Sequence, residues 1–344
     1  METRQYSTYR KQTKKPRRRL YAILFVILLL LGGYGVASFF KDKSVPSAEV
    51  VPSQLTIAED VQLAWPAVGQ AAVASVEDRL LARSSDNEKS RPIASMAKVI
   101  TALAIMEKQP FKLGADGQTY TITKEDIDSM VTYISEEGSV QPLLIGTKLT
   151  QYEAMQRMLM ASDNNMADIL TERIFGSKEA YVSYANDMLK RMGLNRTVIA
   201  DASGFNPKTA STPSEMVTVG IAALKNPVIA EIVAQPQAQI LGDRYPIFKN
   251  TNQMLGTDGV IGIKTGTTDE AGSCLLFAAR YTAEDGKKVT IVGVIMGDTS
   301  HDSLYSDSGK LLTSAKQSFG LVAAQSANNA VVSPPKLMDR AQRY

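Results

Sequence analysis

Three short segments of this sequence carry hydroxyl, amine and amide side chains in a pattern suited to nucleophilic catalysis. They are Ser95-Met-Ala-Lys98, Ser162-Asp-Asn164 and Lys264-Thr-Gly266, separated by 67 and 102 residues. A serine hydroxyl is a weak nucleophile until a nearby base takes its proton. The first segment supplies both groups, because Ser95 and Lys98 lie on one face of a helix as i, i+3 neighbours. The pattern predicts catalysis through an acylated serine.

Each segment by itself has an ordinary structural interpretation. Ser-x-x-Lys also occurs at Ser38–Lys41 and Ser333–Lys336, whereas Lys-Thr-Gly occurs once. Taken singly, Ser95 is a helix N-cap, Asn164 a loop residue and Lys264 a solvated strand lysine. The order and setting of the three segments together favour the catalytic interpretation.

The scarcity of histidine and cysteine limits the kinds of catalytic and metal site that the chain can form. It has one histidine, His301, and one cysteine, Cys274, so an intramolecular disulfide and a Cys- or His-rich metal centre are excluded. We interpret His301 as a surface residue and expect no cofactor. Lys98 is then the general base and must be neutral, a state favoured by burial and by a second cation such as Lys264.

The charge of the chain is concentrated at its N-terminus. The net charge is +3, but residues 1–19 carry eight Lys and Arg against Glu2, hence +7, which leaves −4 for the rest. Because the basic excess lies in a short tail and not on a folded face, nucleic-acid binding is not indicated.

The segment Leu20 to Phe40 predicts a membrane anchor. Its 21 residues contain no charge, and at 1.5 Å per residue they are about 30 Å long, enough to cross a bilayer. The basic tail precedes the span, which predicts a cytoplasmic N-terminus and an extracellular catalytic domain. A cleaved signal peptide is the alternative, but no clear A-x-A site follows the stretch.

The remaining pattern predicts one large α/β domain. We expect a linker at 41–64, the catalytic domain at 65–322 with a helical insertion at about 105–225, and a tail at 323–344. Capping-box patterns at Thr150–Glu153 and Thr212–Glu215 mark two helix starts. Hydrophobic periodicity and turn signals predict further elements. The expected strands are 71–75, 79–83, 260–265, 272–282 and 288–296, and the expected helices include 95–108, 177–192 and 302–319.

In order, spacing and setting, the three segments resemble the motifs of the penicillin-binding serine hydrolases. Other segments are similar to the D-alanyl-D-alanine carboxypeptidase branch, the low-molecular-mass penicillin-binding proteins of the serine β-lactamase-like superfamily. These segments are Gly193-Leu-Asn-Arg-Thr197, Asp201-Ala-Ser-Gly204, Ser211-Thr-Pro213 and Lys264 through Gly272. The resemblance covers about residues 65–320. It implies an antiparallel sheet flanked by helices, with a helical subdomain.

The resemblance also implies roles for individual residues. Ser95 is the nucleophile, Lys98 the general base and Ser162 a proton relay to the leaving amine. The backbone N–H groups of Ser95 and Thr267 form an oxyanion hole. The expected substrate-binding residues are Asn164, Lys264, Thr265, Gly266 and Thr267, and Lys264 and the two threonine hydroxyls hold the terminal carboxylate.

The function implied is a serine-type D-Ala-D-Ala carboxypeptidase acting on peptidoglycan stem peptides, with β-lactams as covalent inhibitors. This activity belongs to cell-wall synthesis and cell shape.

Three alternatives remain open. The segment Asp298 to Asp307 lacks the Arg common in family carboxypeptidases, which favours a D,D-endopeptidase that cuts crosslinks. A β-lactamase would need a carboxylate base after Ser162-Asp-Asn164, but residues 190–207 contain only Asp201. A non-catalytic muropeptide sensor is the third.

Overall fold

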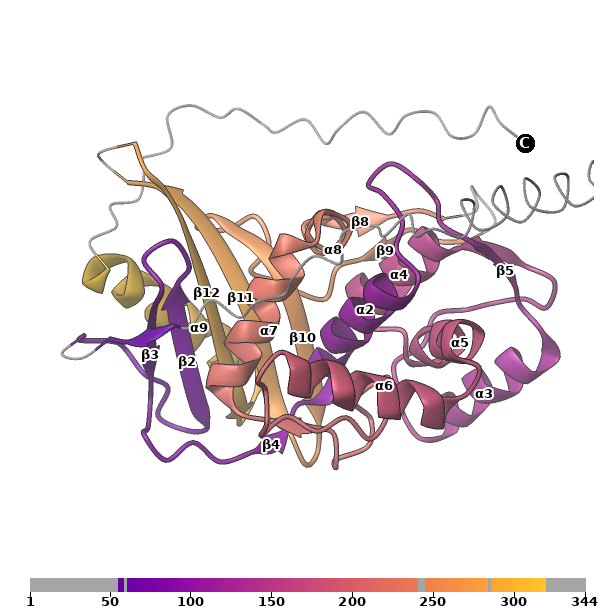
Figure 1. The fold of residues 1–344 in the computed structure, drawn as a ribbon, viewed down its shortest axis with the longest axis horizontal. Coiled ribbons are helices and arrows are strands. Elements are labelled where there is room, and N and C mark those ends of the chain that lie inside the picture. The colour runs from indigo at the N-terminus through magenta and orange to yellow at the C-terminus, as the bar shows by residue number, and fades with distance from the viewer. Residues whose placement is uncertain (1–54, 59–60, 241–244, 284–285, 320–344) are drawn as a thin grey trace, which may run out of the picture. The chain divides into compact units, whose positions relative to one another are not determined.

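A computed structural model describes residues 55–58, 61–240, 245–283 and 286–319 of this chain. A six-stranded sheet forms its centre, in the order β1-β3-β2-β12-β11-β10, and only β1 runs parallel to its neighbour. The strands are β1 (Thr56–Ile57), β2 (Gln70–Ser75), β3 (Leu80–Arg83), β10 (Val260–Thr268), β11 (Gly272–Thr282) and β12 (Lys288–Asp298). Strands from both ends of the described chain therefore share one sheet (Figure 1).

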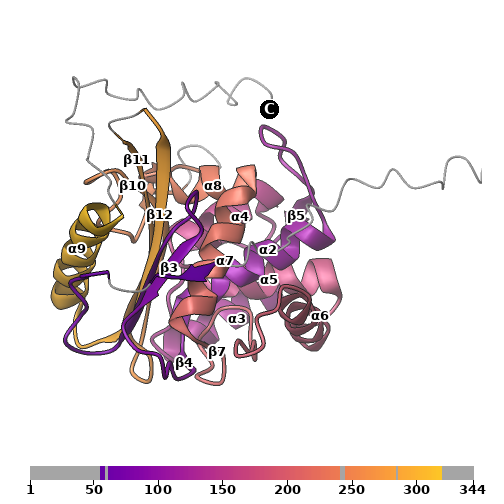
Figure 2. The ribbon, with the colours of Figure 1, turned by 60° about the vertical axis from the view of Figure 1, so that its left-hand side comes forward.

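Helices cover both faces of the sheet. They are η1 (Ala94–Met96), α2 (Ala97–Lys108), α3 (Lys124–Ser135), α4 (Gln151–Met160), α5 (Asn164–Phe175), α6 (Lys178–Arg191), α7 (Pro213–Lys225), α8 (Pro227–Val233) and α9 (His301–Ser318). Figure 2 shows the sheet nearly edge-on, with α9 on one face and the other helices on the opposite face. The described residues also form three short two-stranded ladders: β4 (Arg91–Pro92) with β7 (Ala210–Ser211), β5 (Thr119–Thr121) with β6 (Lys148–Thr150), and β8 (Gln237–Ala238) with β9 (Phe248–Lys249).

The two faces of the sheet bury separate apolar cores because side chains alternate along a strand. On β11, Leu275 and Phe277 pack toward Leu311 of α9, whereas Leu276 packs in the larger core beneath the remaining helices. All four side chains are fully buried. Strand β11, which pairs with the Lys264-bearing strand β10, is thus anchored from both sides.

The expected elements agree with the structure in most places. The hairpins β2–β3 and β11–β12 are antiparallel as predicted, and α6 is capped by Ser177, with Gly193 following at φ 76°. Thr150 forms the full capping box with Glu153. Thr212 accepts from Glu215 N, but the Glu215 carboxylate instead accepts from the backbone N–H of Arg196.

Two expected boundaries need correction. The range 41–64 was expected to be a linker, yet β1 pairs with β3, and Leu55, Val61 and Leu63 pack against the cores. The three apolar side chains pack there because contact with the cores removes their surface from water. Helix α7 falls within the expected helical insertion at about 105–225, but it packs on β2, β11 and β12.

The membrane anchor expected at 20–40, the basic tail at 1–19 and the tail expected at 323–344 lie outside the described residues. In the part of the chain that the structure describes, no single helix combines the length and apolar character of a membrane span. Helices α7 and α8 meet these criteria only as a pair, bent by 104°.

Candidate active site

Ser95 lies in the middle of η1, the 3-10 turn that leads into α2. The preceding residue, Ala94, has a positive φ of 45°, a conformation that is uncommon for non-glycine residues and recurs at functional sites. Two glycines allow other segments to approach this turn. A Cβ on Gly204 would lie 1.9 Å from the Ala94 carbonyl oxygen, and one on Gly266 would lie 2.9 Å from the Ser95 nitrogen. Strand β10 therefore passes directly beside the Ser95 backbone.

Lys98 follows one turn later and is fully buried. Its Nζ atom donates to Ser95 Oγ at 2.8 Å, to Asn164 Oδ1 at 2.7 Å and to the Ser203 carbonyl oxygen at 2.8 Å. Burial lowers the pKa of the Lys98 ammonium to about 7, although the carboxylates of Asp201, Asp163 and Asp168 act to raise it. A buried lysine in this state can accept a proton near neutral pH.

The Ser162-Asp-Asn164 segment connects α4 to α5. Asp163 Oδ2 accepts from Arg157 Nε at 2.9 Å, and the two side chains form a buried ion pair. The Asn164 backbone N–H donates to the Ser139 carbonyl oxygen. Ser162 is buried with a positive φ of 62°. The Arg157–Asp163 pair therefore fixes the turn that aims Asn164 at Lys98.

Asn164 is thus in contact with the expected base, whereas Ser162 has a weaker connection. Within the described residues, no hydrogen bond joins the Ser162 hydroxyl to Ser95 or Lys98. Ser162 lies two residues before Asn164, in the turn between α4 and α5.

The Lys264–Thr267 segment lies on β10. Lys264 is 1% exposed, and its Nζ donates to the Thr265 carbonyl oxygen at 3.0 Å. Burial, and after it the charge of Lys98, holds the pKa of the Lys264 ammonium well below its usual range. We expected Lys264 to lower the pKa of Lys98. Instead, burial is what lowers the pKa of Lys98. The repulsion between the two lysines lowers the pKa of Lys264.

The two threonines of this segment hydrogen-bond to residues from elsewhere in the chain. Thr265 Oγ1 lies 2.7 Å from Thr251 Oγ1, and Thr267 Oγ1 lies 2.9 Å from His301 Nε2. His301 was expected to be an ordinary surface residue. It is exposed, but it stands at the expected substrate-binding strand, and its scarcity in the sequence was the one signal that could have singled it out.

A pocket of about 970 Å³ opens beside Thr267, between the end of α3, residues 201–207 and the turn after β10. Carboxylates dominate its lining, with Lys178 as the basic residue. The acidic lining residues are Glu136, Glu137, Asp168, Asp201, Asp269 and Glu270. The pocket has room for a peptide segment beside Thr267.

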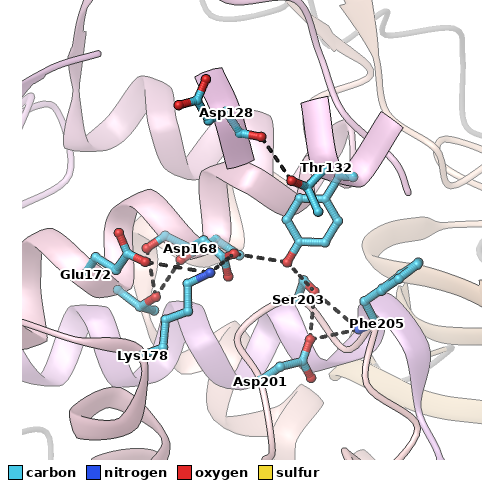
Figure 3. A network of polar contacts seen from close by, with 11 residues as sticks. Asp128, Thr132, Asp168, Glu172, Lys178, Asp201, Ser203 and Phe205 are labelled. Carbon is cyan, nitrogen blue, oxygen red and sulfur yellow. Dashed lines mark hydrogen bonds and ion pairs between the residues drawn. The ribbon is translucent and has the colours of Figure 1, made fainter. Parts of the chain in front are cut away.

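A chain of polar contacts runs along the wall of this pocket (Figure 3). Lys178 Nζ donates to Asp168 Oδ2 at 2.7 Å, and the Tyr133 hydroxyl donates to the same oxygen at 3.1 Å. Asp201 Oδ2 accepts from Ser203 Oγ at 2.7 Å and from Phe205 N at 2.9 Å. Because the Ser203 carbonyl accepts from Lys98, this wall also positions the buried amine.

The structure brings the expected residues together from three distant stretches of the chain. Ser95, Lys98 and Asn164 are linked by hydrogen bonds, Gly266 lies against Ser95, and Lys264 interacts with Lys98 through charge. Within the described residues, no group of three or more His, Cys, Asp or Glu side chains is arranged to hold a metal ion.

Comparisons with known proteins agree with this geometry. The sequence model of the family described as D-alanyl-D-alanine carboxypeptidase matches residues 72–300. The chain is 24% identical over 275 residues to a D-alanyl-D-alanine endopeptidase of Escherichia coli, covering 78% of this chain and 84% of the relative. It is 26% identical over 248 residues to a D-alanyl-D-alanine carboxypeptidase of Streptomyces sp. strain K15, covering 68% and 81%.

The fold is also found among solved structures. The crystal structure of the Streptomyces K15 DD-transpeptidase matches with a TM-score of 0.64 and 22% identity, covering 74% of this chain and 99% of that protein. At this identity the likeness concerns the fold: a mixed sheet with helices on both faces.

Proposed function

This chain belongs to the D-alanyl-D-alanine carboxypeptidase family of penicillin-binding serine D,D-peptidases, and we propose that it acts as a carboxypeptidase through an acyl-Ser95 intermediate. In this reaction Ser95 Oγ attacks the carbonyl carbon between the two D-alanines of a peptidoglycan stem peptide. The bond to the terminal D-alanine breaks, and its amine takes a proton as it leaves. Water then hydrolyses the acyl-serine ester.

The observation that carries this proposal is the set of partners around Lys98. Asn164 Oδ1 and the Ser203 carbonyl oxygen can only accept hydrogen bonds, so they hold two N–H bonds of a neutral amine. The lone pair of that amine then points toward the third partner, the Ser95 hydroxyl, 2.8 Å away. With a pKa of about 7, roughly half of the molecules have a neutral Lys98 at neutral pH.

The other expected residues take roles around the acylated serine. The backbone N–H groups of Ser95 and Thr267 stabilise the oxyanion, a kind of contact whose loss typically costs about 3–4 kcal/mol of transition-state stabilisation. Ser162 relays the proton to the leaving amine. Asn164 Nδ2 donates to the peptide carbonyl of the substrate while its Oδ1 is engaged by Lys98. Lys264, Thr265 and Thr267 face the terminal carboxylate.

A β-lactamase is less well supported, because Asp201 is not available as a base for deacylation. Its carboxylate accepts from Ser203 Oγ, Phe205 N and Thr209 Oγ1. The penicilloyl adduct on Ser95 is therefore long-lived. The hydrogen bonds that join Lys98 to Ser95 and Asn164 favour an intact catalytic site over a muropeptide sensor without turnover.

Cleavage of D-alanyl crosslinks is the second candidate activity. It is favoured by the similarity to an E. coli endopeptidase and by the absence of arginine from residue 281 to residue 338. Incubation with defined muropeptides separates the two activities. We expect free D-alanine from a pentapeptide, with a higher KM for Thr265→Val, which loses a hydroxyl but keeps its shape. Split dimers without D-alanine release from a free pentapeptide would identify an endopeptidase.

The proposed location rests on the sequence before the folded domain. The basic tail at 1–19 stays in the cytoplasm, the span at 20–40 anchors the chain in the cell membrane, and the catalytic domain lies on the cell-wall side. This places the enzyme next to the peptides on which it acts.

A further inference from the structure

His301 is held beside the catalytic strand by the architecture of the sheet. Thr267 of β10 pairs with Ser273 of β11, which pairs with Asp298 of β12. Asp298, the last residue of β12, is therefore two strands away from Thr267, about 10 Å at the usual spacing. The chain then turns back, and three residues later the His301 ring reaches Thr267 Oγ1 at 2.9 Å.

The turn that presents His301 is firmly built. Asp298 Oδ1 accepts from the Thr299 backbone N–H at 2.6 Å and from the Ser303 hydroxyl. Ser300 caps α9, its side chain accepting from the Ser303 N–H at 3.1 Å. His301 is the first residue of this 18-residue helix, and the positive end of the helix dipole lies there. The exposed imidazole is thus fixed in position and open to a ligand.

A substrate with a free C-terminus brings a carboxylate to the region around Thr267. The groups already assigned to that carboxylate offer it little positive charge. The pKa of Lys264 is held well below its usual range, and its Nζ is engaged by the Thr265 carbonyl. The Thr265 and Thr267 hydroxyls are neutral. Asp269 and Glu270 lie immediately beyond the strand in the pocket lining and repel an anion.

We propose that His301 recognises the terminal carboxylate of the substrate together with Thr267, as a specificity-determining residue. The ring N–H and the Thr267 hydroxyl, which now contact each other, each donate to one carboxylate oxygen. This assignment rests on the proposed carboxypeptidase function for the natural substrate. For β-lactams it rests only on acylation of Ser95, because a penicillin also carries a carboxylate next to its reactive carbonyl.

The test compares ligands that differ only in this charge. The first pair is a peptide ending in D-Ala-D-Ala and the same peptide with a C-terminal amide. The second pair is benzylpenicillin and its methyl ester. For each pair, kcat/KM or the acylation rate constant is measured for the wild type and for the variants His301→Ala, His301→Gln and His301→Arg. Lys310→Ala, which removes an exposed cation further along α9, is the matched control.

For His301→Ala we expect the preference for the acid over its neutral partner to fall about tenfold, the size of one hydrogen bond to a charged group. His301→Arg should retain the preference, His301→Gln should keep part of it, and Lys310→Ala should leave it unchanged. Thr267→Val should lower the preference in the same way and add little to His301→Ala.

Two results have distinct meanings. The wild type could release no D-alanine while His301→Ala still lowers the preference for penicillin over its ester. That result would refute the carboxypeptidase function and support the role of His301. Equal losses for the acid and its neutral partner, or an unchanged preference in His301→Ala, would overturn the role of His301.

Discussion

The Nζ atom of Lys98 lies 2.8 Å from the Oγ atom of Ser95, on a lysine that has no exposed surface. Its two other hydrogen-bond partners are carbonyl oxygens. The same three contacts serve both protonation states, because the ammonium donates to all three partners and the neutral amine donates to two and accepts from Ser95. The transfer of a proton from Ser95 therefore needs no rearrangement of the site.

Covalent capture by β-lactams should occur at Ser95. Fluorescent penicillin should label the purified domain, and peptide mapping should place the adduct on the segment that contains Ser95. Ser95→Ala should abolish labelling, whereas Ser90→Ala, which changes an exposed serine nearby, should label like the wild type. Labelling that persists in Ser95→Ala would refute the assignment.

The rate of acylation should depend on the protonation of Lys98. Because the pKa of Lys98 is lowered to about 7 and its neutral form is the proposed base, the rate should rise as the pH increases through about 7. Lys98→Arg keeps a cation that cannot deprotonate and should lose acylation by at least about 100-fold, the lower end for general base catalysis. Stopped-flow measurements of acylation across pH provide the check. A Lys98→Arg enzyme of normal rate would exclude this role.

Asp201 should adjust that pH dependence. Its carboxylate is the largest of the charges that raise the pKa of Lys98. Asp201→Asn should therefore lower the pKa of Lys98 and shift the rising limb of the pH–rate profile to lower pH. The plateau rate should fall, since a less basic amine is a weaker base. Asp86→Asn, which removes an exposed carboxylate, should leave the pH–rate profile unchanged. A profile that also stays unchanged in Asp201→Asn would contradict the electrostatic effect of Asp201 on Lys98.

The buried pair of Arg157 and Asp163 should contribute strongly to stability. Removing one partner of a buried ion pair typically costs about 3–5 kcal/mol, because the other charge is left uncompensated. We expect Arg157→Met to lower the free energy of unfolding by this amount in urea titrations. The pair of Arg191 and Glu107 at the surface is the control, and Arg191→Met should cost about 0–1 kcal/mol. Similar losses for both variants would show that burial of the first pair has little effect.

The topology of the chain can be tested in wall-stripped cells. External protease should release the catalytic domain as a fragment that begins between residue 41 and β1, while the basic tail stays protected. In inside-out vesicles the tail should be cleaved and the domain protected. A membrane-bound domain that resists external protease in intact cells would reverse the proposed orientation.

Local features of the sequence were sufficient for the main strands, for several helices and for the contact between Ser95 and Lys98. Ser95 and Lys98 are three residues apart on one helical turn, so their contact follows from helix geometry. The largely apolar runs at 272–282 and 288–296, with the turn signal Ala283-Glu-Asp-Gly286 between them, predicted that hairpin because both signals are local. The chemistry of an acylated serine with a lysine base followed from residue types alone, since a single histidine left no other common base.

The tertiary structure decided which distant residues complete the site. The contact between Thr267 and His301 depends on the pairing of three strands and on the turn after Asp298, and no spacing in the sequence encodes it. The state of Lys98 likewise depends on how deeply it is buried and on how close Asp201 lies. Burial and electrostatic interaction are set by distances in space, so residues that are far apart or unremarkable in the sequence became functional candidates only after the chain was folded.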